Sequence, residues 1–268
     1  MMNHDPLDRV DGLMREAAER AILPRFRMLA AHEIEEKAPG ELVTAADRDS
    51  EAILTEGLDG LLADARVVGE EACAVDPRLL EGLDRGLVWL VDPLDGTANF
   101  AAGEAEFAIM VALLRDGVTL AGWILDPTSG RLARAELGAG AWIDGERLRS
   151  PSRAPGAPLR GAIGRFMPPA MQEEVIRRAK AGAELVPGLK CAGAEYPLIA
   201  LGERDFAFYW RTLAWDHAAG ALFVNEAGGK ATRPDGSPYL AGSSGSGLIA
   251  ASTPDTWEEV SRLLLGGI

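Results

Sequence analysis

The sequence contains few of the residues that build thiol or imidazole metal sites. Its 268 residues include two cysteines and three histidines. Cys73 and Cys191 are too far apart for a CxxC motif, and the histidines do not fall at a zinc-binding spacing. We therefore expect both cysteines to be small core residues, and the sequence argues against a zinc site of this kind.

The sequence is also poor in positive charge and in long hydrophobic runs. Lys and Arg total 27 against 41 Asp and Glu, which gives a formal net charge of −14. A protein that binds the nucleic-acid backbone would display a basic stripe, so no nucleic-acid polymer is expected as a partner. No run of about 18 apolar residues occurs, and the N-terminus lacks a basic segment followed by an apolar run. These absences predict a cytoplasmic protein with no membrane partner.

Hydrophobic residues make up 47% of the chain, enough for the core of one large domain or two smaller halves. The pattern of residues 7–31 predicts a helix that Pro24 kinks or interrupts, and a second helix is expected after Asp47. Residues 65–71 and 85–96 are typical of strands that end in carboxylates. Three apolar runs closed by Gly or Asp turns then predict an antiparallel meander, at 107–117, 118–130 and 131–145.

The second half of the chain has a different pattern. After the loop-like stretch at 150–158, strand and helix patterns alternate, which is typical of an α/β arrangement. We therefore expect an N-terminal α+β half at 1–150, with most of the metal ligands, and a C-terminal α/β half at 151–268. The two halves could also form one domain.

Acidic residues follow several of the predicted elements. In "VDPLDGTANF", residues 91–100, Asp92 and Asp95 flank a proline, and alone this stretch fits an ordinary Asp-Gly turn equally well. Glu70 ends the preceding strand and Asp216 starts a helix, although either could be a solvated acid when considered alone. Together, four converging carboxylates would repel one another unless divalent cations neutralised them. Oxygen ligands favour magnesium, manganese or calcium over zinc.

The combination of these motifs resembles the inositol monophosphatase family, within the magnesium-dependent, lithium-sensitive phosphatases. The matching stretches are "LVTAAD" at 42–47, "GEE" at 69–71, "DPLDGTANF" at 92–100 and "WDHAAGALFVNEAGG" at 215–229. The resemblance spans most of the chain. It implies a layered αβαβα sandwich, two or three Mg²⁺ ions per active site, a small phosphorylated substrate and a homodimer.

The resemblance also implies roles for individual residues. Glu70 and Asp92 would hold the first metal with the main-chain carbonyl of Leu94, and Asp92, Asp95 and Asp216 would share the second. The residues assigned to catalysis are Asp47, Thr97 and Glu70, with Asp47 and Thr97 orienting and deprotonating a water molecule. The substrate contacts are assigned to Asp95, Gly96, Thr97, Gly193, Ala194, Arg211 and Asp216.

Residue chemistry supports some of these roles and leaves others open. If a helix starts near Thr97, the amides of Gly96 and Thr97 would face a phosphate dianion. Thr97 and Asp47 also fit a helix-capping role. Lys37 is either solvated or approaches the metal region. His217 follows a predicted ligand, but a helical step of about 100° turns it away.

Departures from the inositol-specific pattern concern the substrate. Inositol phosphatases place a glutamate seven residues before the aspartate matching Asp216, where this chain has Tyr209, and Glu195 occupies a position where a small residue is common. The spacing of Arg211 resembles the nucleotidase branch, which acts on 3'-phosphoadenosine 5'-phosphate. The Arg211 fork could hold a second phosphate or carboxylate, or pair with a surface acid.

The expected function is Mg²⁺-dependent hydrolysis of inositol monophosphate, or of a related polyol or sugar phosphate, by metal-activated water. Alternatives are a 3'(2'),5'-bisphosphate nucleotidase, a histidinol phosphatase and a non-catalytic metal-binding relative.

Overall fold

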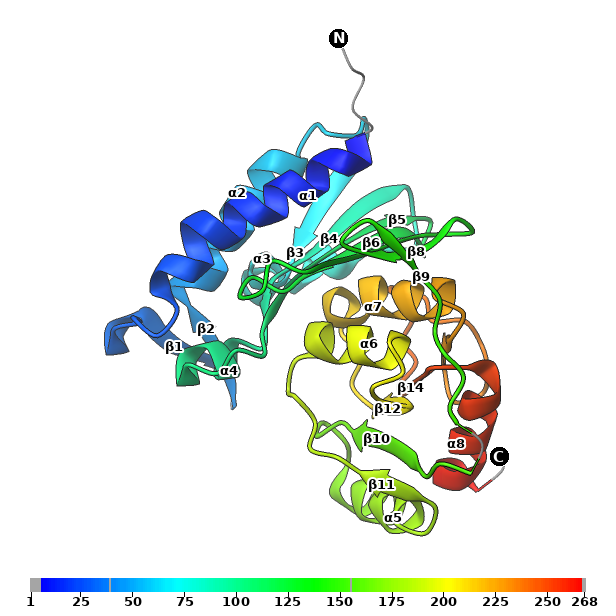
Figure 1. Cartoon of the computed structure of the whole chain (residues 1–268). Helices are drawn as coiled ribbons and strands as arrows, with labels where there is room; N and C mark the ends of the chain where they lie inside the picture. The colour runs from blue at the N-terminus through cyan, green and yellow to red at the C-terminus, as the bar shows by residue number, and fades with distance from the viewer. Residues whose placement is uncertain (1–5, 39, 155, 267–268) are drawn as a thin grey trace.

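Two large β-sheets, one two-stranded sheet and three layers of helices make up residues 6–38, 40–154 and 156–266, the part of the chain that this computed structural model describes (Figure 1). The helices are α1 (Pro6–Ala17), α2 (Ala45–Leu58), α3 (Glu70–Val75), α4 (Thr97–Ala102), α5 (Pro169–Ala179), α6 (Ala192–Ala200), α7 (Ala214–Glu226) and α8 (Pro254–Leu265). Shorter turns are the π-helical η1 (Ala18–Ile22) and the 3₁₀ turns η2 (Leu23–Arg25), η3 (Ala31–Glu33) and η4 (Pro77–Leu80).

The larger sheet has the strand order β3-β4-β5-β6-β7-β8-β9 and the smaller one the order β11-β10-β12-β14-β13. The strands of the larger sheet are β3 (Ala65–Gly69), β4 (Leu87–Asp95), β5 (Ala108–Arg115), β6 (Val118–Leu125), β7 (Leu132–Glu136), β8 (Gly140–Ile143) and β9 (Glu146–Leu148). Those of the smaller sheet are β10 (Leu159–Ile163), β11 (Ala183–Leu185), β12 (Phe206–Tyr209), β13 (Lys230–Thr232) and β14 (Leu248–Ala251), and β1 (Ile34–Ala38) pairs separately with β2 (Glu41–Thr44).

Figure 1 shows the order of the layers. Helices α1 and α2 cover one face of the larger sheet, α6 and α7 lie between the two sheets, and α5 and α8 cover the outer face of the smaller sheet. Three buried apolar clusters fill the spaces between these layers. The expected αβαβα sandwich is therefore confirmed.

The antiparallel meander predicted from residue 107 onward is also present. Strands β4 to β9 pair antiparallel in sequence order, whereas β3 and β4 are parallel. The third predicted run forms two strands, β7 and β8, because residues 137–139 make a tight turn between them. The proposed division at residue 150 stays a prediction, since the cluster between the sheets draws residues from both halves.

Two predicted helices have different boundaries in the structure. The first was expected to reach residue 31, but its helical turns end at Arg25, where Pro24 lies in the 3₁₀ turn η2. The second begins at Ala45, before Asp47, because the side chain of Thr44 caps it by accepting from the Ala46 amide at 3.1 Å. The carboxylate of Asp47 accepts from the Thr44 amide at 2.8 Å, which completes a capping box.

A β-bulge brings Asp92 and Asp95 to the same face of the larger sheet. In a regular strand, residues three apart point to opposite faces. Here Asp92 pairs with Met110 and Asp95 with Ala108, so β4 contains one residue more than β5 between these pairs. The extra residue puts the side chains of Asp92 and Asp95 on the same face of the sheet. Pro93 fits a bulge because it has no N–H to donate. The strand therefore continues to Asp95, within the predicted range of 85–96 and directly before Gly96.

Helix α7 packs closely against the larger sheet, and this contact positions Asp216. The approach depends on Gly122 of β6, where a Cβ atom would lie 2.7 Å from the Cα of Ala219. A methyl group at this point has no space unless the helix moves away from the strand. The separation of α7 from the sheet is therefore set by a residue outside the predicted motifs.

We expect Gly122→Ala to lower the free energy of unfolding by about 1 to 3 kcal/mol, the usual cost of overpacking a core. Urea denaturation followed by circular dichroism measures this change. Gly12→Ala is the matched control, since Gly12 lies in α1 and a Cβ there meets nothing within 4 Å. It should leave stability equal or slightly higher. Equal losses in both variants would contradict the close-contact explanation.

Candidate active site

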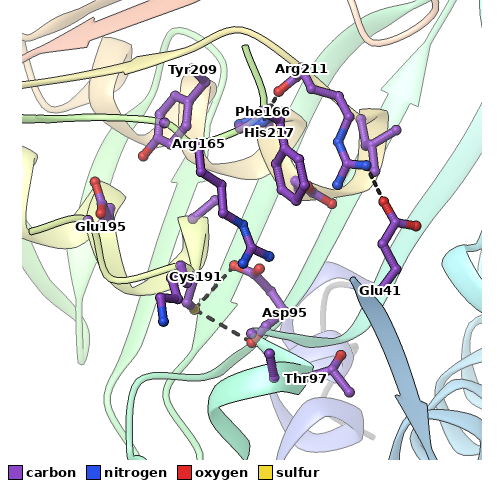
Figure 2. Close-up of a pocket in the computed structure, with 18 of the residues that line it drawn as sticks. Glu41, Asp95, Thr97, Arg165, Phe166, Cys191, Glu195, Tyr209, Arg211 and His217 are labelled. Atoms are coloured by element: carbon purple, nitrogen blue, oxygen red, sulfur yellow. Dashed lines mark hydrogen bonds and ion pairs between the residues drawn. The ribbon is translucent and has the colours of Figure 1, made fainter. Parts of the chain in front are cut away.

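A cavity of about 440 Å³ lies where the larger sheet, α4, α6 and α7 meet the smaller sheet. Figure 2 shows side chains from all of these elements directed toward it. Its wall contains the predicted residues Glu70, Asp92, Leu94, Asp95, Gly96, Thr97, Arg211 and Asp216. The motifs that lie far apart in the sequence are therefore brought to one place.

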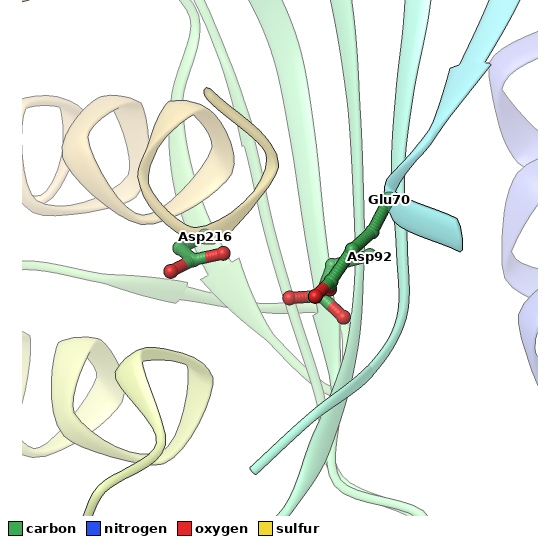
Figure 3. A group of neighbouring side chains, drawn as sticks. All are labelled: Glu70, Asp92 and Asp216. Carbon is green, nitrogen blue, oxygen red and sulfur yellow. The ribbon is translucent and has the colours of Figure 1, made fainter. Parts of the chain in front are cut away.

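Three carboxylates form a group at the base of this cavity. Glu70 begins α3, Asp92 lies at the bulge of β4 and Asp216 is in the first turn of α7 (Figure 3). One oxygen of each lies within 4.8 Å of the others. Burial, followed by the charges of the neighbouring carboxylates, raises the pKa of Asp92 and of Asp216 well above the ordinary value.

The fourth predicted carboxylate, Asp95, is held beside this group by α6. Its Oδ2 atom accepts from the Gly193 amide at 2.6 Å and from the Cys191 thiol at 3.2 Å. Burial raises the pKa of Asp95, and the two hydrogen bonds partly offset the rise. Gly193 therefore orients a carboxylate. Neither Gly193 nor Ala194, both predicted substrate contacts, is among the described residues of the cavity wall.

Lys37 approaches the carboxylate group, one of the two possibilities considered for it. Its ammonium nitrogen lies 2.7 Å from an oxygen of Glu70 and 2.7 Å from an oxygen of Glu71. Burial alone would lower the pKa of Lys37, but the charges of the two glutamates and their hydrogen bonds outweigh this effect and raise it. Lys37 thus places positive charge beside Glu70, and this charge also partly offsets the rise in the pKa of Asp216.

One face of α2 holds three other parts of the site in place. Asp47, Ser50 and Glu51 are three and four residues apart, so they share a face of the helix, and all are buried. Ser50 donates to the carbonyl of Pro93 at 2.9 Å. Glu51 accepts from the amides that follow Glu70 at the start of α3, at 2.8 Å. Sequence reasoning missed Ser50 and Glu51, although their helical spacing from Asp47 was a usable signal.

Asp47 itself contacts Thr97 across the bulge. The Thr97 hydroxyl lies 2.8 Å from Oδ1 of Asp47 and 3.0 Å from the carbonyl oxygen of Leu94. Burial raises the pKa of Asp47 to about 6, and hydrogen bonds from Thr44 and Thr97 partly offset it. Thr97 is the first residue of α4, and Gly96, with φ of 87°, takes the N-cap position. The capping role considered for Thr97 is therefore wrong, since its hydroxyl points to Asp47.

The opposite wall carries the residues that depart from the inositol-specific pattern. Arg211 forms an ion pair with Glu41 at the rim, which is the pairing considered as the alternative for this arginine. Tyr209 and Glu195 also line the cavity. Glu195 is 4% exposed and accepts from the Leu189 amide at 2.6 Å.

His217 also lines this wall, although the helical step had predicted that it would turn away. The His217 ring is nevertheless buried and held by a neighbouring side chain. Its Nδ1 atom lies 2.8 Å from the Tyr196 hydroxyl. Because burial lowers the pKa of His217 to about 3, its ring is neutral near pH 7. Cys73 and Cys191 are buried free thiols, as expected.

The layered fold and this site place the protein among the phosphoric monoester hydrolases. The chain belongs to the inositol monophosphatase family, whose model matches residues 4–264.

Individual relatives agree with this membership. The inositol-1-monophosphatase of Rhizobium meliloti is 34% identical over 220 residues, which cover 77% of this chain and 78% of the relative. A protein of Thermotoga maritima named fructose-1,6-bisphosphatase/inositol-1-monophosphatase is 30% identical over 192 residues, which cover 72% of this chain and 71% of the relative. The structure also superposes on the crystal structure of the extragenic suppressor protein suhB from Bartonella henselae with a TM-score of 0.81. The two sequences are 26% identical, and the superposition covers 98% of each chain.

Proposed function

We propose that this protein hydrolyses a small phosphate monoester, with inositol monophosphate or a related polyol or sugar phosphate as substrate and Mg²⁺ as cofactor. The observation that carries the proposal is that the Glu70, Asp92 and Asp216 group lies in one cavity with Thr97, whose hydroxyl contacts the buried Asp47 behind the cavity wall. The names of relatives such as the Rhizobium meliloti inositol-1-monophosphatase support the substrate class.

The donor set fits a hard divalent cation. The carboxylates of buried Asp92 and half-buried Glu70 and Asp216 lie within 4.8 Å of one another and repel, and their oxygens are the ligands that Mg²⁺ prefers. Glu70, Asp92, the carbonyl of Leu94, Asp95 and Asp216 would hold two or three such ions. When bound, they supply charge neutralisation of the phosphate, a lower pKa for water and stabilisation of the leaving oxygen.

The chain's own groups would prepare a water molecule for in-line attack. If the Thr97 hydroxyl donates to Asp47, its oxygen is free to accept a hydrogen bond from a water in the cavity. The Asp47 carboxylate would then receive the proton through Thr97, and Glu70 would orient the same water from the other side. The amides of Gly96 and Thr97, at the start of α4, would receive phosphate oxygens.

Other substrates have specific support in the chain. A bisphosphate is favoured by the name of the Thermotoga maritima relative and by the Arg211 spacing that resembles the 3'(2'),5'-bisphosphate nucleotidases. Histidinol phosphate remains a further candidate. Homodimer formation and a cytoplasmic location also stay predictions. Within the described residues, every helix is too short or too polar to cross a bilayer.

Phosphate release from a panel of inositol phosphates, sugar phosphates, histidinol phosphate and bisphosphate nucleotides tests the proposal. We expect turnover of at least one polyol or sugar phosphate with Mg²⁺ and its loss in excess EDTA, with recovery when Mg²⁺ is restored. A well-folded protein that releases no phosphate from any of these substrates would instead support a non-catalytic metal-binding relative. Release that persists in EDTA would contradict the metal assignment.

A further inference from the structure

We propose that Arg165 binds a second anionic group, a phosphate or a carboxylate, on the leaving-group part of the substrate. The inference rests on the proposed phosphatase function and narrows its substrate class. Arg165 follows β10 in the stretch "IGRFM" and carries no sequence motif. The structure alone places it in the wall of the active-site cavity.

The backbone around Arg165 is fixed to the smaller sheet. The Gly164 amide donates to the carbonyl of Phe208 on β12 at 2.7 Å, which anchors the chain just before Arg165. The side chain of Arg165 is exposed, and Figure 2 shows it reaching from this anchor into the cavity, in the direction of Asp95. A substrate whose reacting phosphate lies between the proposed cation site and the start of α4 would therefore pass beside this guanidinium.

An aromatic ring further restricts the guanidinium. The Cζ atom of Arg165 lies 4.5 Å from the ring centre of Phe166, and that of Arg211 lies 3.7 Å from the same centre. In Figure 2 the Phe166 ring lies between the two arginine side chains. Stacking of this kind orients the plane of a guanidinium and leaves its N–H edge free for two parallel hydrogen bonds to an anion.

The charges at this rim are unequal. Arg211 is paired with Glu41. Throughout residues 6–38, 40–154 and 156–266, by contrast, no carboxylate pairs with Arg165, although acids outnumber bases by 41 to 27 in the sequence. Two guanidinium groups share one ring while only one has a counter-ion. The reacting phosphate would already be neutralised at the cation site, so an additional anion on the substrate best matches the remaining positive charge.

Three substrates with one carbon skeleton test the subsite. Sorbitol 6-phosphate has a neutral leaving group, 6-phosphogluconate adds a carboxylate and sorbitol 1,6-bisphosphate adds a phosphate. For each doubly anionic substrate we compare kcat/KM with that of sorbitol 6-phosphate. Arg165→Met should lower at least one of these ratios about 10- to 100-fold, the effect of removing a hydrogen bond between charged groups. Arg165→Lys should lower the same kcat/KM ratio by a smaller factor, because lysine keeps the positive charge but lacks the planar guanidinium that forms two parallel hydrogen bonds.

Arg147→Met is the matched control. Arg147 also lies over an aromatic ring, that of Trp142, but outside the described cavity wall, so its replacement should leave both ratios unchanged. An equal fall with all three substrates would show that Arg165 contacts the reacting phosphate, and no fall would show a solvated arginine. Either result overturns the inference.

Titration calorimetry with the bisphosphate in Mg²⁺ at low temperature compares the binding affinities of the wild type and Arg165→Met. This comparison does not depend on turnover. Equal affinity of Arg165→Met and wild type would overturn the subsite. Absence of phosphate release from every substrate by the wild-type protein would instead count against the proposed function.

Discussion

Asp92→Asn should reduce Mg²⁺-dependent phosphate release by about a thousandfold or more. Asp92 is the most central member of the carboxylate group. Burial is the largest cause of its raised pKa, and the charges of Glu70, Asp95 and Asp216 all raise that pKa further. Neutralising it removes the charge that would bridge two cations. Bound cations contribute several kcal/mol to such reactions, and each roughly 1.4 kcal/mol corresponds to a tenfold change in rate. Initial rates at saturating Mg²⁺ measure the loss.

The stability of this variant separates a loss of metal binding from a loss of fold. In EDTA the thermal midpoint should equal or exceed that of the wild type, because one repelling charge is gone and Oδ1 of the asparagine can still accept from the Leu94 amide, as Asp92 does at 3.1 Å. Added Mg²⁺ should raise the wild-type midpoint and have little effect on the variant. Asp116→Asn, at an exposed turn after β5, is the control and should keep both activity and the Mg²⁺ response. Wild-type turnover by Asp92→Asn would show that the cluster is not the catalytic cation site.

Thr97→Val should lower kcat about 10²- to 10⁴-fold, the range expected for loss of general-base assistance. Valine keeps the shape of the side chain but removes the hydroxyl that lies 2.8 Å from Asp47. Binding of inorganic phosphate should survive, because the backbone amides at the start of α4 remain. Single-turnover rates and competitive inhibition by phosphate measure the two properties separately.

Thr97→Ser provides the matched comparison for that experiment. It restores the hydroxyl without the methyl group, so most of the lost rate should return. If Thr97→Val weakened phosphate binding while kcat stayed the same, Thr97 would be a substrate contact with no part in proton transfer. A similar loss in the serine variant would indicate a packing defect in α4.

The parts of the site that were predictable from sequence are those that depend on local patterns. Glu70, Asp92 and Asp216 follow or begin recognisable elements, and carboxylates at such positions tend to gather at a sheet edge. The αβαβα arrangement, however, came from the family resemblance, because the patterns alone indicated only an α+β half and an α/β half.

Other features depend on contacts that local patterns do not encode. Asp47 and Thr97 are 50 residues apart, and each fits a helix cap equally well until the fold brings them together. Asp95 was expected to join the carboxylate group, and the structure holds it beside that group. The amide that holds it belongs to Gly193 of α6, and the motif around Asp95 gives no sign of this contact. The pairing of Arg211 with Glu41, and the absence of a carboxylate partner for Arg165 among the described residues, depend on tertiary neighbours that follow no sequence spacing.

The three contacts made by one face of α2 have a consequence for motion. Thr97, the Pro93 carbonyl and the start of α3 are all held by the same helix, so a fluctuation that lifts α2 from the sheet releases them together. The catalytic geometry should then exist in two states, fully assembled or fully lost, with the population set by how well α2 docks. Damage at the α1–α2 interface, far from the cavity, would therefore reduce the fraction of competent molecules while the remaining ones bind substrate normally.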